Sequence, residues 1–132
     1  MGSSPTVLLA DDEPLITSVV AQKLRSAGFQ VLVAHDGEEA LEVASRTPPD
    51  VVVTDLQMPR LSGLELAIRL KAMPSTTNVP VIMLTARGYI VGQSELGSTN
   101  IRYLMSKPFS PREVLAKVNA VLGRGEEGLR VA

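Results

Sequence analysis

Five short runs of apolar residues recur along the chain, and between them apolar residues return every three or four positions. The first, third and fourth runs are almost continuous in Val, Leu and Ile, which is typical of central parallel strands covered on both faces. The pattern therefore predicts five strands, at residues 6–10, 31–34, 51–54, 79–84 and 101–105.

The segments between these runs carry helix boundary signals. Pro14 falls in the first turn of the first segment, and Gly28 follows its last turn. We expect the core-facing stripe of this helix to consist of Ile16, Val20, Leu24 and Ala27.

Three later helices have a cap residue followed three positions on by Glu, the pattern of a capping box. The predicted starts are Asp36, Ser62 and Ser110. The last helix is expected to bury Val114, Leu115, Val118 and Val121. The fourth helix is the weakest prediction, because each Gly costs about 1 kcal/mol in a helix interior. Its segment contains Gly88, Gly92 and Gly97.

Strands that alternate with helices at this spacing predict βαβ units, right-handed crossovers and a parallel sheet. The fold class is therefore α/β, with one domain over residues 5–123 and a polar tail over residues 124–132. If the acids that follow strands one and three are to meet, these strands must be neighbours. That condition gives the flavodoxin-like, doubly wound order 2-1-3-4-5.

Composition narrows the functional classes. The 132 residues are 45% hydrophobic and 20% charged, with a net charge of -1. That balance is typical of a globular domain and supplies no basic surface for nucleic acid or an anionic membrane. The chain has no Cys, which excludes disulfides and thiolate metal sites and agrees with a cytoplasmic location. The single histidine, His35, is expected in a solvated loop.

Polar side chains follow four of the five predicted strands. Asp11 and Asp12 come after the first strand, Asp55 after the third, Thr85 after the fourth and Lys107 after the fifth. Parallel strands deliver their carboxyl ends to one edge of the sheet, where ligands bind in such folds. We therefore expect these side chains to converge.

Three neighbouring carboxylates stay ionised only if a cation offsets their repulsion. Oxygen ligands without His or Cys favour Mg²⁺, with Mn²⁺ as a substitute. An Asp beside such an ion can act as a nucleophile and form an aspartyl phosphate. A Lys and a Thr hydroxyl can then interact with the phosphoryl oxygens.

The strand-end residues belong to a series of short motifs, which are Asp11-Asp12, Asp55, Met58-Pro59, Gly63, Leu84-Thr85-Ala86 and Lys107-Pro108-Phe109. In this order and spacing, the motifs resemble the receiver domain of bacterial two-component response regulators over about residues 6–122. The resemblance implies that Asp55 accepts a phosphoryl group from a sensor histidine kinase or a phosphotransfer protein. It also implies contacts from Thr85 and Lys107 to that group, and a cis bond between Lys107 and Pro108.

The resemblance further implies that Asp12 binds Mg²⁺ directly and Asp11 through water, with Asp55 and the carbonyl of Gln57 completing the metal site. Pro59 and Gly63 would shape the loop after the acceptor. Such a module gates signalling and turns over no metabolite. Its kinase, its downstream target and a homodimer that forms on phosphorylation are left open.

The sequence departs from the family at the switch aromatic, three residues before the Lys, where it has Leu104. Tyr103 lies one step earlier, on the opposite face of the strand. We therefore expect activation to be read out through the backbone and packing of the face formed by the fourth helix, fifth strand and fifth helix. Gln57 and Arg87 are expected to slow dephosphorylation by crowding the path of water.

Three other functions remain in competition. A phosphohydrolase of the haloacid-dehalogenase type also forms an aspartyl phosphate, but it normally has an acid where this chain has Gln57. A flavodoxin-like cofactor binder would need aromatic side chains, and the chain has two Tyr, two Phe and no Trp. A pseudo-receiver that serves only for docking would not need the complete acid set.

Overall fold

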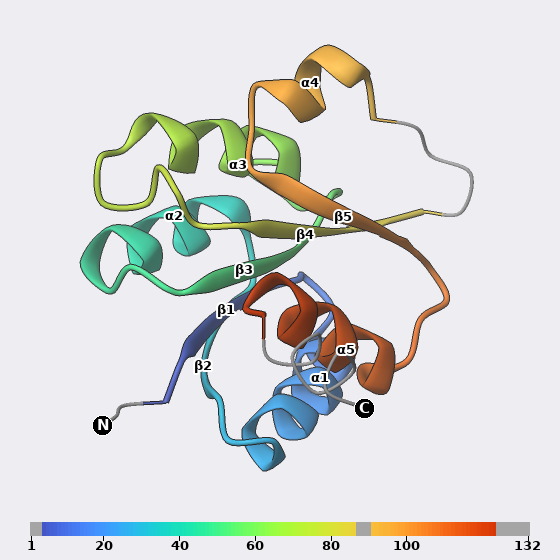
Figure 1. Ribbon diagram of the computed structural model, residues 1–132. Helices are drawn as coiled ribbons and strands as arrows, with labels where there is room; N and C mark the ends of the chain where they lie inside the picture. The colour runs from blue at the N-terminus through green and yellow to red at the C-terminus, as the bar shows by residue number, and fades with distance from the viewer. Residues whose placement is uncertain (1–3, 87–90, 124–132) are drawn as a thin grey trace.

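The computed structural model describes residues 4–86 and 91–123, which form five strands and five helices in strict alternation (Figure 1). The order along the chain is β1 (Thr6–Ala10), α1 (Pro14–Ser26), β2 (Gln30–Ala34), α2 (Gly37–Arg46), β3 (Val51–Asp55), α3 (Gly63–Ala72), β4 (Val81–Thr85), α4 (Gln93–Gly97), β5 (Ile101–Ser106) and α5 (Pro111–Val121).

All the strand pairs are parallel, and the sheet order is β2-β1-β3-β4-β5. The predicted fold class and strand order are therefore confirmed. The limits of β4 differ from the prediction, because this strand begins at Val81 and ends at Thr85. The third strand includes Asp55 itself. The carboxylate of Asp55 is therefore attached to the sheet and not to a loop.

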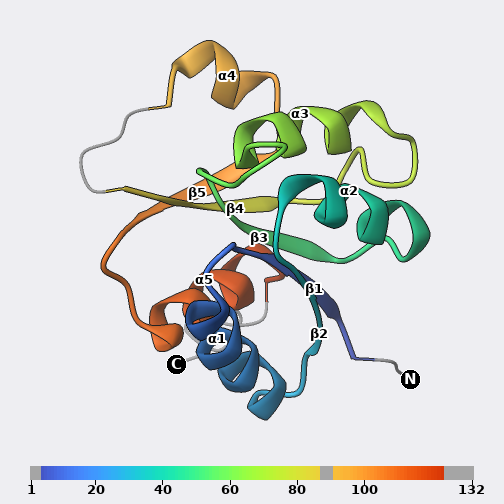
Figure 2. The ribbon, with the colours of Figure 1, turned by 180° about the vertical axis from the view of Figure 1, so that it is seen from behind.

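Helices cover both faces of the sheet (Figures 1 and 2). Alternate strand residues, such as Val7 and Leu9, pack with α1 and α5 in one buried cluster. The residues between them, such as Leu8 and Val52, pack with α2 and α3 in a second cluster. Both clusters contain residues of β1, β3 and β4, which explains why these strands read as continuous apolar runs.

The helix boundaries and their buried stripes follow the sequence signals with two corrections. Ser62 with Glu65 and Ser110 with Glu113 form reciprocal capping boxes. At α2, Asp36 accepts from the backbone N–H of Glu39, but the Glu39 carboxylate accepts from His35 rather than from Asp36. That side chain therefore extends one residue further than a capping box requires.

The second correction is in α1, where Ala27 is exposed although the periodicity placed it in the core stripe. The helix ends at Ser26, so Ala27 is its C-cap and no longer follows the helical repeat. In α5, Val114 and Val118 are buried. Leu115 and Val121 are partly buried against the same cluster.

Helix α4 is short, only five residues, in agreement with its weak sequence signal. Tyr103 and Leu104 of β5 lie on opposite faces, as strand alternation predicts. Tyr103 packs toward α5, where the Lys117 ammonium lies 4.6 Å from its ring centre, whereas Leu104 is 41% exposed. No helix within residues 4–86 and 91–123 is long and apolar enough to cross a membrane.

Candidate functional site

The carboxyl ends of β1 and β3 bring the acids together. Ala10 pairs with Thr54 in the sheet, so Asp11 and Asp55, the next residues, leave neighbouring strands side by side. Carboxylate oxygens of Asp11, Asp12 and Asp55 lie within 4.8 Å of one another. Asp11 and Asp55 are buried, and Asp12 is exposed at the mouth. The predicted convergence of the three acids is thus present in the fold.

Asp11 is the most constrained of these acids. Its Oδ1 accepts from the backbone N–H of Glu13 at 2.9 Å. Its Oδ2 is buried and has no hydrogen-bond partner among the residues that the structure describes. Burial, followed by the negative charge of Asp55, raises the pKa of Asp11 from 3.8 to about 6, although the Glu13 N–H opposes the shift. An unsatisfied carboxylate oxygen among other carboxylates fits a divalent cation with oxygen ligands.

Lys107 supplies the positive charge of the site. Its Nζ lies 3.1 Å from Oδ2 of Asp55 and 3.6 Å from Oε1 of Glu13. Burial acts to lower the pKa of Lys107. The hydrogen bond to Asp55 and the surrounding negative charges outweigh burial, so the pKa is raised above its ordinary value of 10.5. The amine is therefore a permanent cation beside the acceptor carboxylate.

The bond between Lys107 and Pro108 is cis, as expected from the resemblance. The backbone N–H of Lys107 donates to the carbonyl of Thr85 at 2.9 Å, which fixes the end of β5 against β4. The hydroxyl of Thr85 is buried and donates to the carbonyl of Met105 at 3.4 Å. In this structure, then, the Thr85 hydroxyl is engaged with β5 rather than with the acids.

The loop after Asp55 is held close to the strand end. The N–H of Gly63 donates to the carbonyl of Leu56 at 2.8 Å. A Cβ at Gly63 would lie 2.3 Å from the carbonyl oxygen of Asp55, so no larger residue fits there without movement. Arg60 has a φ of 70°, a left-handed conformation that non-Gly residues seldom adopt. Its guanidinium lies 3.5 Å from Asp36.

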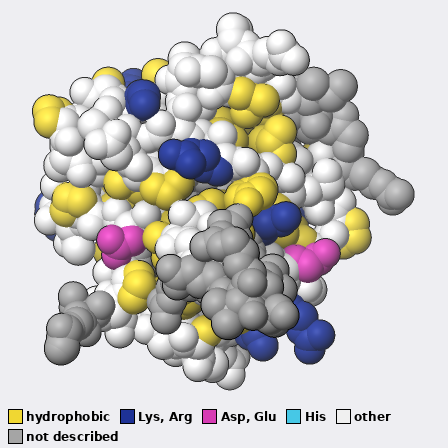
Figure 3. Space-filling view, viewed as in Figure 1, with side chains coloured by type: hydrophobic (Ala, Val, Ile, Leu, Met, Phe, Trp, Pro, Cys, Tyr) yellow, Lys and Arg dark blue, Asp and Glu magenta, His cyan; other side chains and the backbone are white. Residues whose placement is uncertain are grey.

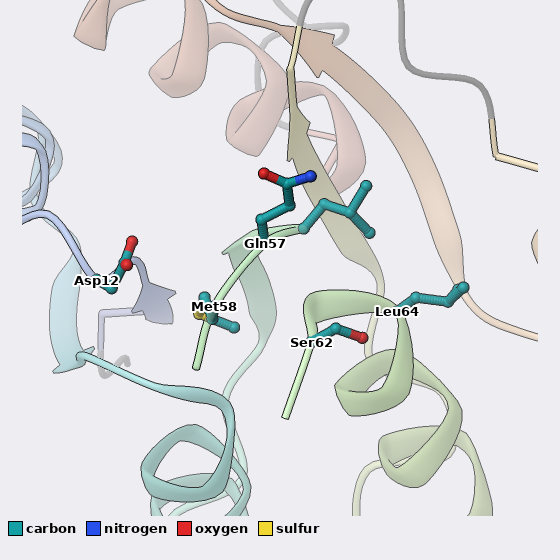
Figure 4. A pocket seen from close by; sticks show the side chains of 6 residues that line it. Asp12, Gln57, Met58, Ser62 and Leu64 are labelled. Carbon is teal, nitrogen blue, oxygen red and sulfur yellow. The ribbon is translucent and has the colours of Figure 1, made fainter. Parts of the chain in front are cut away.

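Gln57 lies at the mouth of the site. Its backbone N–H donates to Oδ1 of Asp55 at 3.4 Å, and its side chain is exposed. An open cleft of about 430 Å³ lies between the loop after β1 and the start of α3. Figure 4 shows Asp12 on one side of this cleft, Gln57 and Met58 in the middle, and Ser62 and Leu64 on the other. Of the three acids, Asp12 lines this open cleft, whereas Asp11 and Asp55 are buried behind it.

Two ionic contacts were not predicted from the sequence, those of Glu13 with Lys107 and of Arg60 with Asp36. Glu13 directly follows the acid pair, so the sequence indicates its charge. The sequence does not indicate that the Lys107 side chain extends far enough to contact it. Arg87, expected to crowd the acceptor, lies outside the described residues.

Comparison with known proteins identifies this arrangement. Residues 7–119 match the response regulator receiver domain family. The chain belongs to that family. It is 38% identical to the phosphate regulon transcriptional regulatory protein PhoB of Pseudomonas aeruginosa over 123 residues, which cover 93% of this chain and 54% of PhoB. The chain thus spans about half the length of this curated relative.

Solved receiver domains have the same fold. A putative response regulator from Chloroflexus aurantiacus is 32% identical, with a TM-score of 0.82 over 92% of this chain and 100% of that one. The receiver domain of the sensor histidine kinase PA1611 from Pseudomonas aeruginosa PAO1 is 26% identical, with a TM-score of 0.80 over 92% of this chain and 99% of that one. That structure has a magnesium ion coordinated in the active site cleft. Phosphoacceptor signalling fits this receiver domain better than the competing functions do.

Proposed function

We propose that Asp55 is the phosphoryl acceptor of a two-component phosphorelay. The observation that carries the proposal is the position of Lys107, 3.1 Å from a buried strand-end carboxylate that two further acids adjoin. An Asp55 oxygen attacks the phosphorus of the donor and forms an aspartyl phosphate. The bond from phosphorus to the donor atom breaks, and its electron pair leaves with the donor.

The surrounding residues stabilise the charge that is transferred. Lys107 interacts with the phosphoryl oxygens as a point charge, and the Thr85 hydroxyl donates to one of them after leaving its carbonyl partner. Bound Mg²⁺, for which Mn²⁺ can substitute, would supply further charge neutralisation. The residues that would hold it are Asp11, Asp12, Asp55 and the carbonyl of Gln57.

The donor is a phosphohistidine on a sensor histidine kinase or a phosphotransfer protein. An apolar groove of about 390 Å³ is lined in part by Lys107, the residue that donates to Asp55. Its walls come from α1 and from the segment between β5 and α5, and Leu15 on α1 is 76% exposed. Such a surface beside the lysine that contacts Asp55 suits a docked protein. The chain itself turns over no metabolite, and Gln57 in place of an acid disfavours a phosphohydrolase.

The output is a switch of the face made by α4, β5 and α5. Hydrophobic side chains gather along β5 below α4 (Figure 3), and a hollow of about 250 Å³ there is lined by Leu96 and Leu104 among others. The five-residue α4 has little helix propensity to hold it, so its local opening should require little free energy. Beryllofluoride can take the place of the phosphoryl group on Asp55. If it leaves the amide hydrogen exchange of residues 91–106 unchanged, the α4-β5-α5 face is not the output surface.

We further propose that the receiver domain extends over residues 5–123, that residues 124–132 are a polar tail, and that the protein is cytoplasmic. The relative PhoB is named a transcriptional regulatory protein, so the expectation that residues 5–123 bind no nucleic acid directly stays a prediction.

The direct test is phosphorylation by acetyl phosphate with and without Mg²⁺. We expect the wild type and Asp50→Asn to be labelled and Asp55→Asn not to be. Asp50 is a matched control because it is an exposed acid just before the same strand, where it accepts from the N–H of Thr6. Labelling of Asp55→Asn at the wild-type rate would contradict the proposal.

A further inference from the structure

Glu13 occupies the N-cap position of α1 but does not cap the helix with its side chain. Its backbone is fixed on both sides. The N–H donates to Asp11, and the carbonyl accepts from the N–H of Thr17 at 3.1 Å. Ser, Thr, Asp and Asn are the usual residues at this position, because their short side chains reach the free N–H groups. A longer carboxylate here is therefore available for another contact.

That contact is with Lys107. Oε1 of Glu13 lies 3.6 Å from Nζ of Lys107, and the same Nζ also donates to Asp55. The two carboxylates come from different strand ends, and the flexible lysine joins them. The Glu13 side chain is 58% exposed, so its hydration is largely retained while it holds the amine.

The two ion pairs of Lys107 respond differently to the reaction. When an Asp55 oxygen bonds to phosphorus, the carboxylate loses charge and its attraction for the amine weakens. The charge then resides on the phosphoryl oxygens, and the amine must shift toward them. The Glu13 carboxylate does not react, so it attracts the amine before and after the transfer.

We propose that Glu13 is a positioning residue. It holds the Lys107 amine at the acceptor while the partner of that amine changes from the Asp55 carboxylate to the phosphoryl group. This role rests on the proposed function of Asp55. It acts through Lys107 alone, and it requires no contact between Glu13 and the phosphoryl donor. Without Glu13, the flexible four-carbon side chain of Lys107 samples more conformations, and fewer of them place the amine near the phosphoryl oxygens.

The experiment compares phosphorylation of the wild type and Glu13→Gln by acetyl phosphate at saturating Mg²⁺. We expect Glu13→Gln to be about two- to fivefold slower, the range that corresponds to one exposed ion pair. The difference should shrink as ionic strength rises, because salt screens such pairs. Glu38→Gln, an exposed acid in the first turn of α2, is the matched control and should keep the wild-type rate.

Two further variants separate positioning from bulk charge. In a Lys107→Ala background, Glu13→Gln should have no additional effect, because the residue through which it acts is gone. Glu13→Asp keeps the charge on a shorter side chain and should give an intermediate rate. A Glu13→Gln rate equal to or above that of the wild type overturns the proposal, since loss of a negative charge alone would favour an anionic donor. Equal slowing without Lys107 also overturns it. If the wild type is not labelled at Asp55 at all, it is the proposed function that fails.

Discussion

Replacing Asp11 by Asn should stabilise the protein when no divalent cation is present. The buried carboxylate has one unsatisfied oxygen and lies beside two other acids. An amide keeps an oxygen for the N–H of Glu13 and offers N–H donors to the neighbouring carboxylates. The pKa of Asp11 is raised from 3.8 to about 6, mainly by burial. That difference corresponds to about 3 kcal/mol of destabilisation by the charged form at neutral pH.

Because the pKa of Asp11 is raised on folding, the destabilisation is confined to the pH range in which this carboxylate is ionised. The folded state holds the Asp11 proton more tightly than the unfolded state, so the wild type loses stability as pH rises. Below about pH 3.8 the carboxyl is protonated in both states and the penalty vanishes. The penalty grows between about pH 4 and pH 6 and is complete above that range. Asp11→Asn has no such group, so its advantage should follow the same curve.

Urea denaturation of both proteins at pH 4.5 and pH 7.5, with a chelator, measures this advantage as a difference in unfolding free energy. Glu38→Gln controls for loss of an exposed charge. Adding Mg²⁺ at pH 7.5 should stabilise the wild type more than Asp11→Asn, because a bound cation removes the penalty. Burial of the Asp11 charge does not destabilise the protein if Asp11→Asn is less stable than the wild type at pH 7.5 without Mg²⁺, or if the difference in unfolding free energy does not change with pH.

Three further outcomes are expected. Gly63→Ala should lower the unfolding free energy by about 1–3 kcal/mol, because the new Cβ would meet backbone at 2.3 Å, whereas Gly97→Ala, with nothing within 4 Å, should not destabilise in the same urea titration. Asp12→Ala should weaken Mg²⁺ binding more than Asp11→Ala in a fluorescence or calorimetric titration, and equal losses would contradict direct coordination by Asp12. Gln57→Ala should shorten the lifetime of the phosphorylated protein, measured after removal of acetyl phosphate, and an unchanged lifetime would exclude crowding by Gln57.

Much of this architecture is encoded locally. The apolar runs predict the five strands because a buried strand needs apolar residues on both faces, and Ser62 and Ser110 cap helices through contacts only three residues long. The convergence of Asp11 and Asp55 is predictable for a different reason. Parallel strands end at a common edge, so residues 44 positions apart meet once the strand order is known.

The differences from prediction have tertiary causes. Val79 continues the apolar pattern of β4, yet its N–H donates to Thr76 in the preceding turn, and the strand begins only at Val81. Glu39 reaches His35 because the chain before α2 is extended and presents that N–H. The ion pair between Lys107 and Glu13 depends on the distance between separate strand ends, which a local sequence pattern does not predict.

Phosphorylation at Asp55 can be located by borohydride reduction after treatment with acetyl phosphate and Mg²⁺. The reagent converts an aspartyl phosphate to homoserine, and peptide mass spectrometry then locates the modified residue. We expect homoserine at position 55 in the wild type, dependent on Mg²⁺, and at no other Asp. Homoserine at Asp11 or Asp12, or a phosphorylated protein without homoserine at Asp55, would contradict it.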